Sequence, residues 1–277
     1  MREDWLERDS VRLHYLEWPA AEAQEPAVLL LHGLSSNAHY WERVAARLPG
    51  RRLVALDQRS HGLSDRPAGA NGMGELVADA AHAITDLGLG RPVVAGHSWG
   101  AAVALDLAAT RSELAGGLVF IDGPGSPLSE LLTWDQAAQM MQPPLPRYAS
   151  LKEAAAEARR DLAEAWGADL MEFVRAKLTP DGDALVLTLG EAVRLEMLKG
   201  IYAFQPGLLW PQVAGPVTAI WARSAPAPIL SWKEAAAELL RSLVPDAAIR
   251  WYESPHDVPL HRPAEVAADI EGLCERA

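Results

Sequence analysis

A Gly-x-Ser-x-Gly pentapeptide at residues 96–100 lies between a short apolar run and an alanine-rich run. The apolar run has the length of a strand, and the alanine-rich run favours a helix. A serine on such a sharp strand-to-helix turn has strained backbone angles, and glycines two positions before and after it keep the strand and the helix from colliding. The helix would point its first N–H groups at Ser98, where negative charge develops during acyl transfer. Ser98 is therefore predicted to be a nucleophile.

Apolar runs of strand length alternate with helical patterns through most of the chain. The runs are continuous, as in strands buried on both faces of a parallel sheet, and we expect them at 27–31, 53–56, 92–96, 117–121, 216–221 and 248–252. Helices are predicted at 41–48, 75–87, 99–109, 231–243 and 263–276. Residues 5–18 alternate apolar and polar side chains around the turn residues Asp9 and Ser10, which predicts a hairpin at the sheet edge. The pattern indicates an α/β fold with a mostly parallel, doubly wound sheet.

The alternation stops between about Pro127 and Gln212. This segment shows almost no strand signal, and its helical periodicity lies at 128–141, 151–166, 169–178 and 189–204, with a proline-rich joint at 142–146. We predict a helical cap, residues 127–212, inserted after the sixth strand into a core formed by residues 1–126 and 213–277. Six aromatic side chains are expected mostly to hold the cap helices together, with one or two lining a substrate pocket: Trp134, Tyr148, Trp166, Tyr202, Phe204 and Trp210.

Several polar residues directly follow predicted strands. His32, Asp57, Ser98 and Asp122 do so, and a loop at 253–259 follows the last strand. Because ligands bind beyond the carboxyl ends of the strands in such sheets, these residues are expected to converge on one rim. A serine hydroxyl is a poor nucleophile until a base removes its proton, so a histidine must reach Ser98 and a carboxylate should orient that histidine.

His256 is the candidate base among the eight histidines. It lies in the proline-flanked loop after the last strand, whereas several other histidines fall in predicted strands or helices. We expect His97, adjacent to Ser98, to pack behind the site. We expect His32 to support the loop that follows it, and His61 and His261 to be structural.

The chain resembles the α/β-hydrolase superfamily over essentially its whole length. Four motifs carry the resemblance: Leu-Leu-His-Gly at 30–33, Asp-Gln-Arg-Ser-His-Gly-Leu-Ser-Asp at 57–65, Gly-His-Ser-Trp-Gly at 96–100 and Ser-Pro-His-Asp-Val-Pro at 254–259. A lone Gly-x-Ser-x-Gly is weak, but four motifs in order, each after a predicted strand, are a strong signal. The resemblance implies an oxyanion hole made by the backbone N–H groups of Leu34 and Trp99. It also implies a structural turn at 57–65, in which Ser60 stands where relatives usually carry Gly.

The acid of the expected triad is displaced relative to many members of this superfamily. They carry it a few residues after the strand corresponding to 216–221, where this chain has Ala225. Some relatives instead place the acid after the preceding strand, where this chain has Asp122. An Asp before Gly-Pro is also a common turn former, which is the structural alternative. We predict a triad of Ser98, His256 and Asp122, and we consider Asp257 poorly placed to orient its neighbour.

The leading hypothesis is a serine hydrolase that cleaves a small ester, lactone or related acyl compound through an acyl-enzyme. Ser98 argues against haloalkane dehalogenases and epoxide hydrolases, relatives that attack through an aspartate at this position. Carbon–carbon bond hydrolysis, cofactor-free perhydrolysis and aminopeptidase activity remain open, and the last would use a cap carboxylate such as Glu191 or Glu196 to bind an amine. A ligand-binding protein with a degraded triad is the non-enzymatic alternative, motivated by Ala225.

Composition narrows the expected partners and location. A net charge of -12 and a pI near 5.1 oppose non-specific binding to nucleic acid or to anionic membranes. The single cysteine, Cys274, excludes an intramolecular disulfide and a cysteine-based metal cluster. No apolar run approaches the length of a membrane span, and the acidic, polar N-terminus shows no apolar core of signal-peptide length. We expect a cytoplasmic monomer or homodimer that acts on a small-molecule substrate without a cofactor or metal.

Overall fold

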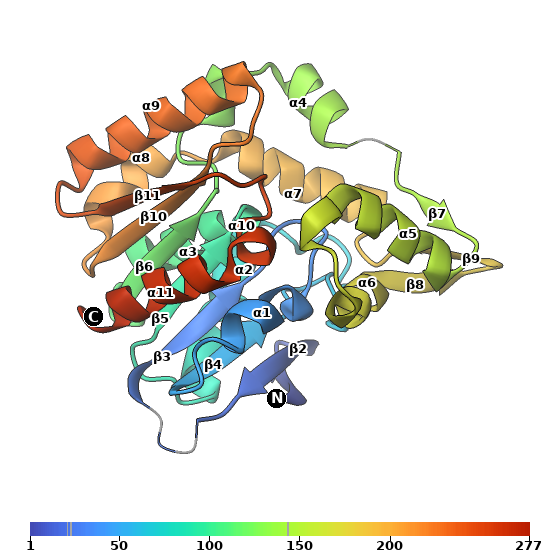
Figure 1. The fold of residues 1–277 in the computed structure, drawn as a ribbon, viewed down its shortest axis with the longest axis horizontal. Helices are drawn as coiled ribbons and strands as arrows, with labels where there is room; N and C mark the ends of the chain where they lie inside the picture. The colour runs from blue at the N-terminus through green and yellow to red at the C-terminus, as the bar shows by residue number, and fades with distance from the viewer. Residues whose placement is uncertain (21, 23, 143) are drawn as a thin grey trace.

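The computed structural model describes residues 1–20, 22, 24–142 and 144–277, and within them the main sheet has eight strands in the order β1-β2-β4-β3-β5-β6-β10-β11 (Figure 1). The strands are β1 (Arg2–Arg8), β2 (Val11–Trp18), β3 (Gln24–Leu31), β4 (Arg51–Leu56), β5 (Val93–His97), β6 (Gly117–Ile121), β10 (Val217–Ala222) and β11 (Ala248–Tyr252). β2 pairs antiparallel with β1 and β4, and the other neighbours pair parallel. The predicted parallel sheet and edge hairpin are confirmed.

Helices cover both faces of this sheet because successive strand residues face opposite ways. Leu29 and Leu31 of β3 belong to the core under one set of helices, and Val28 and Leu30 belong to the core under the other. The first set is α2 (Met73–Asp86), α3 (Trp99–Thr110), α8 (Pro206–Leu209) and α9 (Ala227–Leu243). The second set is α1 (Glu42–Ala45) and α11 (Pro263–Cys274), with α10 (Val258–His261) beside α11. The continuous apolar runs in the sequence therefore correspond to strands buried on both faces.

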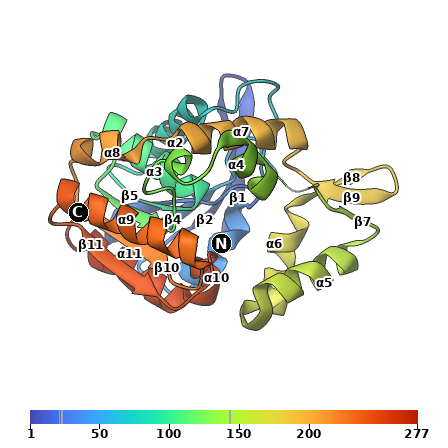
Figure 2. The ribbon, with the colours of Figure 1, turned by 90° about the horizontal axis from the view of Figure 1, so that it is seen from above.

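Among its described residues, the segment between β6 and β10 contains four further α-helices and three short strands. The helices are α4 (Trp134–Met141), α5 (Leu151–Leu162), α6 (Met171–Arg175) and α7 (Glu191–Ala203). The strands are β7 (Arg147–Tyr148), β8 (Leu178–Asp181) and β9 (Ala184–Leu187), and they form a separate sheet in the order β7-β9-β8. Figures 1 and 2 both show this small sheet with α5 and α6 to one side of the main sheet. Pro143, in the predicted proline-rich joint, lies outside the described residues.

The prediction of almost no strand in this segment was wrong. A helix was expected through residue 178, but α6 ends at Arg175, and β8 and β9 form a hairpin across Gly182 and Asp183. Gly182 has a φ of 60°, which suits a tight two-residue turn. Strands of four residues are too short to show an alternation, so the sequence pattern missed them. The boundaries given above for core and cap remain predictions.

The turn after β4 is fixed to the rest of the core by hydrogen bonds from Asp57. Its carboxylate accepts from the backbone N–H groups of Ala38 at 2.6 Å and Leu63 at 2.9 Å, and His14 Nδ1 lies 2.8 Å away. Ser64 Oγ donates to the Asp57 carbonyl at 2.6 Å. The turn therefore has the structural role that the resemblance implied, close to the rim of the sheet.

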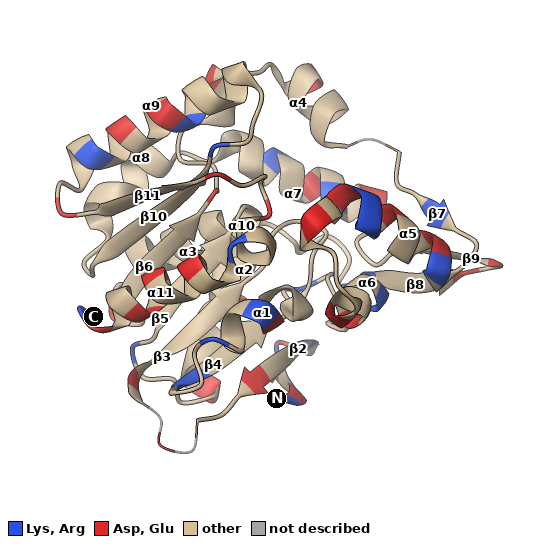
Figure 3. Cartoon of the chain, viewed as in Figure 1, with Lys and Arg blue, Asp and Glu red and all other residues tan. Residues whose placement is uncertain are grey.

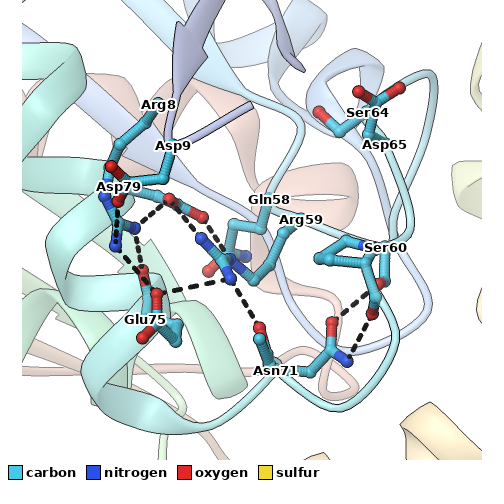
Figure 4. Close-up of polar contacts among 12 residues, drawn as sticks. Arg8, Asp9, Gln58, Arg59, Ser60, Ser64, Asp65, Asn71, Glu75 and Asp79 are labelled. Carbon is cyan, nitrogen blue, oxygen red and sulfur yellow. Dashed lines mark hydrogen bonds and ion pairs between the residues drawn. The ribbon is translucent and has the colours of Figure 1, made fainter. Parts of the chain in front are cut away.

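A buried ion-pair network joins this turn to α2 (Figure 4). Arg59 pairs with Asp79 of α2, and both side chains are 2% exposed. Arg8 also donates to Asp79, at 2.6 Å. Ser60 has a φ of 66°, in the left-handed region that a glycine adopts without strain, and its hydroxyl donates to Asn71 at 2.7 Å. The departure from Gly at this position thus adds a hydrogen bond to a strained residue.

Charged side chains lie mainly on the outer helices and loops, while β5, β6 and β10 contain none (Figure 3). Among the described residues, no helix combines the length and apolar character that crossing a membrane requires.

Candidate active site

Ser98 sits at the junction of β5 and α3 with φ 55° and ψ -118°, a strained conformation for a residue with a side chain. Its backbone N–H donates to the carbonyl of Ile121 at 2.8 Å. A Cβ added to Gly96 would lie 2.1 Å from the carbonyl oxygen of Gly100, and one added to Gly100 would lie 2.3 Å from that of Leu31. Both glycines are therefore required by close backbone approach, as the sequence pattern predicted.

The structure brings Ser98, His256 and Asp122 into one chain of hydrogen bonds. His256 Nε2 lies 2.9 Å from Ser98 Oγ, and His256 Nδ1 lies 2.6 Å from Asp122 Oδ2. The three residues come from the ends of β5, β11 and β6. With Asp122 ionised, Nδ1 carries the proton and Nε2 is free to accept from the serine hydroxyl; this proton placement is assigned from the network.

Asp122 has a further partner that the sequence analysis missed, Lys233 of α9. Lys233 Nζ donates to Asp122 Oδ2 at 2.7 Å, and the two side chains are 7% and 0% exposed. The other carboxylate oxygen accepts from the Ala222 N–H at 2.9 Å. Lys233 shares the buried stripe of α9 with Ala236, Ala237 and Leu240. A lysine on the apolar face of a helix is the sequence signal that points to a buried anion.

Neighbouring charges shift the pKa values of Asp122 and His256. Burial acts to raise the pKa of Asp122, but the hydrogen bond to His256 and the positive charges of His256 and Lys233 outweigh it and hold that pKa below its ordinary value. Burial acts to lower the pKa of His256, but the hydrogen bond and charge of Asp122 outweigh it and raise that pKa, while Lys233 opposes the rise. Asp122 therefore stays ionised where His256 changes protonation.

The neighbours of His256 hold its loop in place. His97 Nε2 lies 2.9 Å from the His256 carbonyl oxygen and donates to it, and the His97 ring stacks on Tyr40 at 4.9 Å. Burial lowers the pKa of His97 to about 4, so its ring is neutral. Asp257 accepts a hydrogen bond from the Tyr40 hydroxyl at 3.2 Å and has no hydrogen bond to the His256 ring. His97 packs behind the site as expected.

The loop after β3 approaches Ser98 closely. A Cβ on Gly33 would lie 3.1 Å from the Ser98 Cβ, a contact so tight that a larger residue would have to displace its neighbours. His32 Nδ1 lies 2.8 Å from the Gly33 carbonyl oxygen, and His61 Nε2 accepts from the Ser35 N–H at 3.1 Å. Both histidines therefore brace this loop.

Leu34 follows Gly33 in the loop that approaches Ser98 and lines a cavity with Ser98, and Trp99 directly follows Ser98. Within the part of the chain that the structure describes, neither residue's backbone N–H donates a hydrogen bond. Trp99 is the first residue of α3, where N–H groups have no partner inside the helix. These two donors are therefore available to a third group beside Ser98.

Two cavities meet at Ser98 and His256, and we call them the charged cavity and the apolar cavity. The charged cavity, of about 320 Å³, is lined by Leu34 and by five charged side chains: Glu157, Asp161, Lys177, Arg194 and Asp257. The apolar cavity, of about 330 Å³, is lined by Trp99 and by residues including Leu128, Met141, Ile201, Ile229 and Trp232, with Asp122 and Lys233 near the junction. Ala225, at the position where many relatives carry the acid, also lines the apolar cavity.

Several cap residues singled out in the sequence lie elsewhere. Of the six cap aromatics, Tyr148 lines the charged cavity. Trp134 and Tyr202 stack edge to face at 5.5 Å, which fits a role in holding helices together. Neither Glu191 nor Glu196 lines either cavity.

The sequence of this chain is similar to those of known proteins. The sequence profile described as the alpha/beta hydrolase family matches residues 28–269. The 2-(acetamidomethylene)succinate hydrolase of Mesorhizobium japonicum is 37% identical over 98 residues, 35% of this chain and 35% of that protein. Epoxide hydrolase B of Mycobacterium tuberculosis is 32% identical over 146 residues, 48% of this chain and 41% of that protein. The alignments thus span less than half the length of these relatives.

Solved structures share the fold over nearly the whole chain. The thioesterase domain from the curacin biosynthetic pathway has a TM-score of 0.81 at 19% identity, covering 98% of this chain and 99% of the other. The structure of E-2-(acetamidomethylene)succinate hydrolase has a TM-score of 0.81 at 22% identity, covering 99% of each chain. At these identities the likeness speaks to the fold alone.

Proposed function

The chain belongs to the alpha/beta hydrolase family, and on that premise we propose that it is a serine hydrolase that cleaves a small ester, lactone or related acyl compound. The observation that carries this proposal is the hydrogen-bonded chain of Ser98, His256 and Asp122 at the meeting point of two cavities. Nucleophile, base and orienting acid then have the geometry that acyl transfer needs.

The reaction proceeds in two halves. His256 Nε2 takes the proton from Ser98 Oγ while Oγ attacks the substrate carbonyl, and the Leu34 and Trp99 N–H groups bind the oxyanion. His256 returns the proton to the leaving oxygen as the tetrahedral intermediate collapses to an acyl-enzyme. A water molecule, deprotonated by His256, then attacks the acyl carbon and releases the acid and free Ser98.

Asp122 and Lys233 support the base in different ways. The Asp122 carboxylate holds the Nδ1 proton of His256 and stabilises the imidazolium that forms in each half-reaction. Lys233 stabilises the ionised form of the buried Asp122 and limits how strongly that carboxylate raises the pKa of His256. Lys233 is thus a positioning residue that acts through Asp122.

Three of the alternatives are less well supported, whereas carbon–carbon bond hydrolysis and perhydrolysis stay open. An epoxide hydrolase is among the relatives, but its ester intermediate forms on an aspartate at the position of Ser98, and a serine cannot form that intermediate. An aminopeptidase was expected to use Glu191 or Glu196, yet Glu191 is exposed and Glu196 accepts a hydrogen bond from the Asn71 N–H at 3.1 Å. The position of Asp122 supports an intact triad rather than a degraded one.

The test is covalent labelling with a fluorophosphonate probe. We expect one adduct per chain, mapped to Ser98, and its loss in Ser98→Ala and in chemically denatured wild type. A folded wild-type protein that is not labelled, or that is labelled equally well after Ser98→Ala, would contradict the proposal.

A further inference from the structure

The charged side chains of the charged cavity divide into two groups. Lys177 Nζ lies 4.1 Å from the centre of the Phe173 ring. Burial acts to lower the pKa of Lys177, and the negative charges of three carboxylates oppose that shift. These belong to Glu157, Asp161 and Asp257. The three carboxylates therefore favour the charged form of Lys177.

Two of the three carboxylates also have tyrosine partners. The Tyr148 hydroxyl donates to Glu157 at 2.7 Å, and the Tyr40 hydroxyl donates to Asp257 at 3.2 Å. Asp161 lies on the exposed rim. Among the described residues these are the acidic side chains that face this cavity.

Arg194 of α7 is the other cation of the cavity, and no carboxylate compensates it. Its Nε and Nη2 donate to the Met141 carbonyl at 3.2 and 2.7 Å, and its Nη1 donates to Ser35 Oγ. Within the described part of the chain it forms no ion pair, and burial alone lowers its pKa. A guanidinium has five N–H donors, so two of them have no partner among the described residues.

The place of Arg194 relates these donors to the reacting centre. Ser35 directly follows Leu34, whose N–H we assign to the oxyanion hole, and Met141 lines the apolar cavity. Arg194 therefore lines the charged cavity beside the loop that carries Leu34, and it also contacts Met141 of the apolar cavity. A partly buried guanidinium without a counter-ion is a strong site for a carboxylate, which it binds with two parallel hydrogen bonds.

We propose that the substrate carries a carboxylate close to its scissile carbonyl, that Arg194 binds this carboxylate, and that the apolar remainder of the substrate occupies the apolar cavity. This inference rests on the proposed function, since it places the carboxylate relative to Ser98. Arg194 is then a specificity-determining residue. The competing account is structural: Arg194 only caps the last turn of α4 through the Met141 carbonyl.

Three arylsulfonyl fluorides that differ in their para substituent test the proposal. The substituents are carboxylate, methyl and aminoethyl, so the probes are anionic, neutral and cationic. Ser98 Oγ displaces fluoride from sulfur and its proton passes to His256, so the labelling rate, followed by intact mass, needs no known substrate. Intrinsic reactivity differs among the probes but cancels when the rate of a variant is divided by that of the wild type.

We expect Arg194→Met to slow labelling by the carboxylate probe about 10- to 100-fold, the range expected for losing a hydrogen-bonded ion pair. The methyl probe should label this variant at close to the wild-type rate. Arg194→Lys, which keeps the charge, should retain most of the carboxylate labelling. Lys199→Met, an exposed cation on the same helix, should change none of the rates.

Equal slowing of all three probes by Arg194→Met would show a structural role only and overturn the proposal. An unchanged rate for the carboxylate probe in Arg194→Met would also overturn it, because Arg194 would then contribute nothing to binding an anionic substituent. If Arg194→Met does not fold, protection of the wild type decides: glutarate should slow labelling by the methyl probe and glutaramide should not, and equal effects would overturn the proposal. Absence of any labelling of folded wild type would instead count against the proposed function.

Discussion

The charged cavity and the apolar cavity are nearly equal in volume, at about 320 and 330 Å³, but only the first combines apolar side chains with a cluster of five charged ones. The charged cavity presents five charged side chains, which come from α5, α7, the connection between α6 and β8, and the His256 loop. The apolar cavity presents methionine, isoleucine and tryptophan side chains from α3, α4, α7 and α9, together with Leu128. Ser98 and His256 belong to both. If the proposed function holds, this contrast would orient an amphipathic acyl compound in one direction across Ser98.

Because the two cavities differ, substitutions at their junction and substitutions in a single cavity should affect activity in different ways. Residues at the junction act on every substrate, because the reacting carbonyl lies there whichever groups fill the cavities. Residues that line a single cavity affect only the substrates whose acyl chain reaches that cavity. A pair of nitrophenyl esters with a short acetyl and a longer hexanoyl chain distinguishes the two kinds.

The largest effect is expected at the junction. Asp122→Asn should lower kcat by about 10⁴-fold for both esters, because the imidazole loses the partner that holds its tautomer and stabilises its charge. Steady-state kinetics with both esters measure this. Asp257→Asn is the matched control, since it alters the residue next to His256 without touching its ring, and it should cost less than about tenfold. Equal losses in the two variants would remove Asp122 from the proposed mechanism.

A charge placed in the apolar cavity should lower kcat/KM more for the hexanoyl ester than for the acetyl ester. Ile229→Asp lines that cavity with a carboxylate, and we expect kcat/KM to fall about 10- to 100-fold for the hexanoyl ester and less than about threefold for the acetyl ester. Ala235→Asp, on the exposed face of the same helix, controls for the added charge and should change neither. If the acetyl ester suffers as much as the hexanoyl ester, the apolar cavity does not hold the chain.

Substitution of Lys233 should change the pH dependence of kcat/KM more than the value of kcat/KM at high pH. The base must be neutral to accept the serine proton, so kcat/KM falls as the pH drops through the pKa of His256, which lies above its ordinary value. Lys233→Met removes a positive charge that lowers this pKa, so the acidic limb should move to higher pH for both esters, with less than about tenfold loss on the alkaline plateau. A limb that stays in place or moves to lower pH would refute this role.

The same substitution should reduce stability, because it removes a partner of a buried carboxylate. We expect Lys233→Met to lower the free energy of unfolding by about 3 kcal/mol, measured by urea denaturation. Lys233→Arg retains the charge and should lose less than Lys233→Met does.

A substitution far from both cavities should have the smallest effect on the ratio of kcat/KM for the two esters. Arg59→Met breaks the buried pair with Asp79 and should cost about 3 kcal/mol of stability. The ratio of kcat/KM for the two esters should stay at its wild-type value, because the pair lies between the 57–65 turn and α2. A changed ratio would mean that this turn helps to shape a cavity.

Sequence alone predicted the sheet, the elbow and the positions of Ser98, His256 and Asp122 because each depends on local backbone geometry. Gly96 and Gly100 are required wherever a helix starts that close to a strand, and each polar residue follows an apolar run that ends at the same rim. Asp122 was found because Ala225 stood at the alternative position and topology allowed a second one. Each of these structural requirements can be recognised in a few adjacent residues of the sequence.

Lys233 and Arg194 could not be placed in the same way. Lys233 meets Asp122 across 111 positions of the chain, and Arg194 meets Ser35 across 159. No local pattern specifies such a contact, because it depends on how α9 and α7 pack against the sheet. The β8–β9 hairpin was missed for a different reason, since its strands have only four residues each and do not alternate apolar and polar side chains.

The most direct measurement is rapid mixing of the enzyme with the nitrophenyl hexanoyl ester, followed by mass mapping of the quenched protein. The account predicts a burst of nitrophenol equal to the enzyme concentration and an added hexanoyl group on the peptide containing Ser98, both absent in Ser98→Ala. Steady turnover by wild type and Ser98→Ala alike, with no acyl group on that peptide, would contradict it.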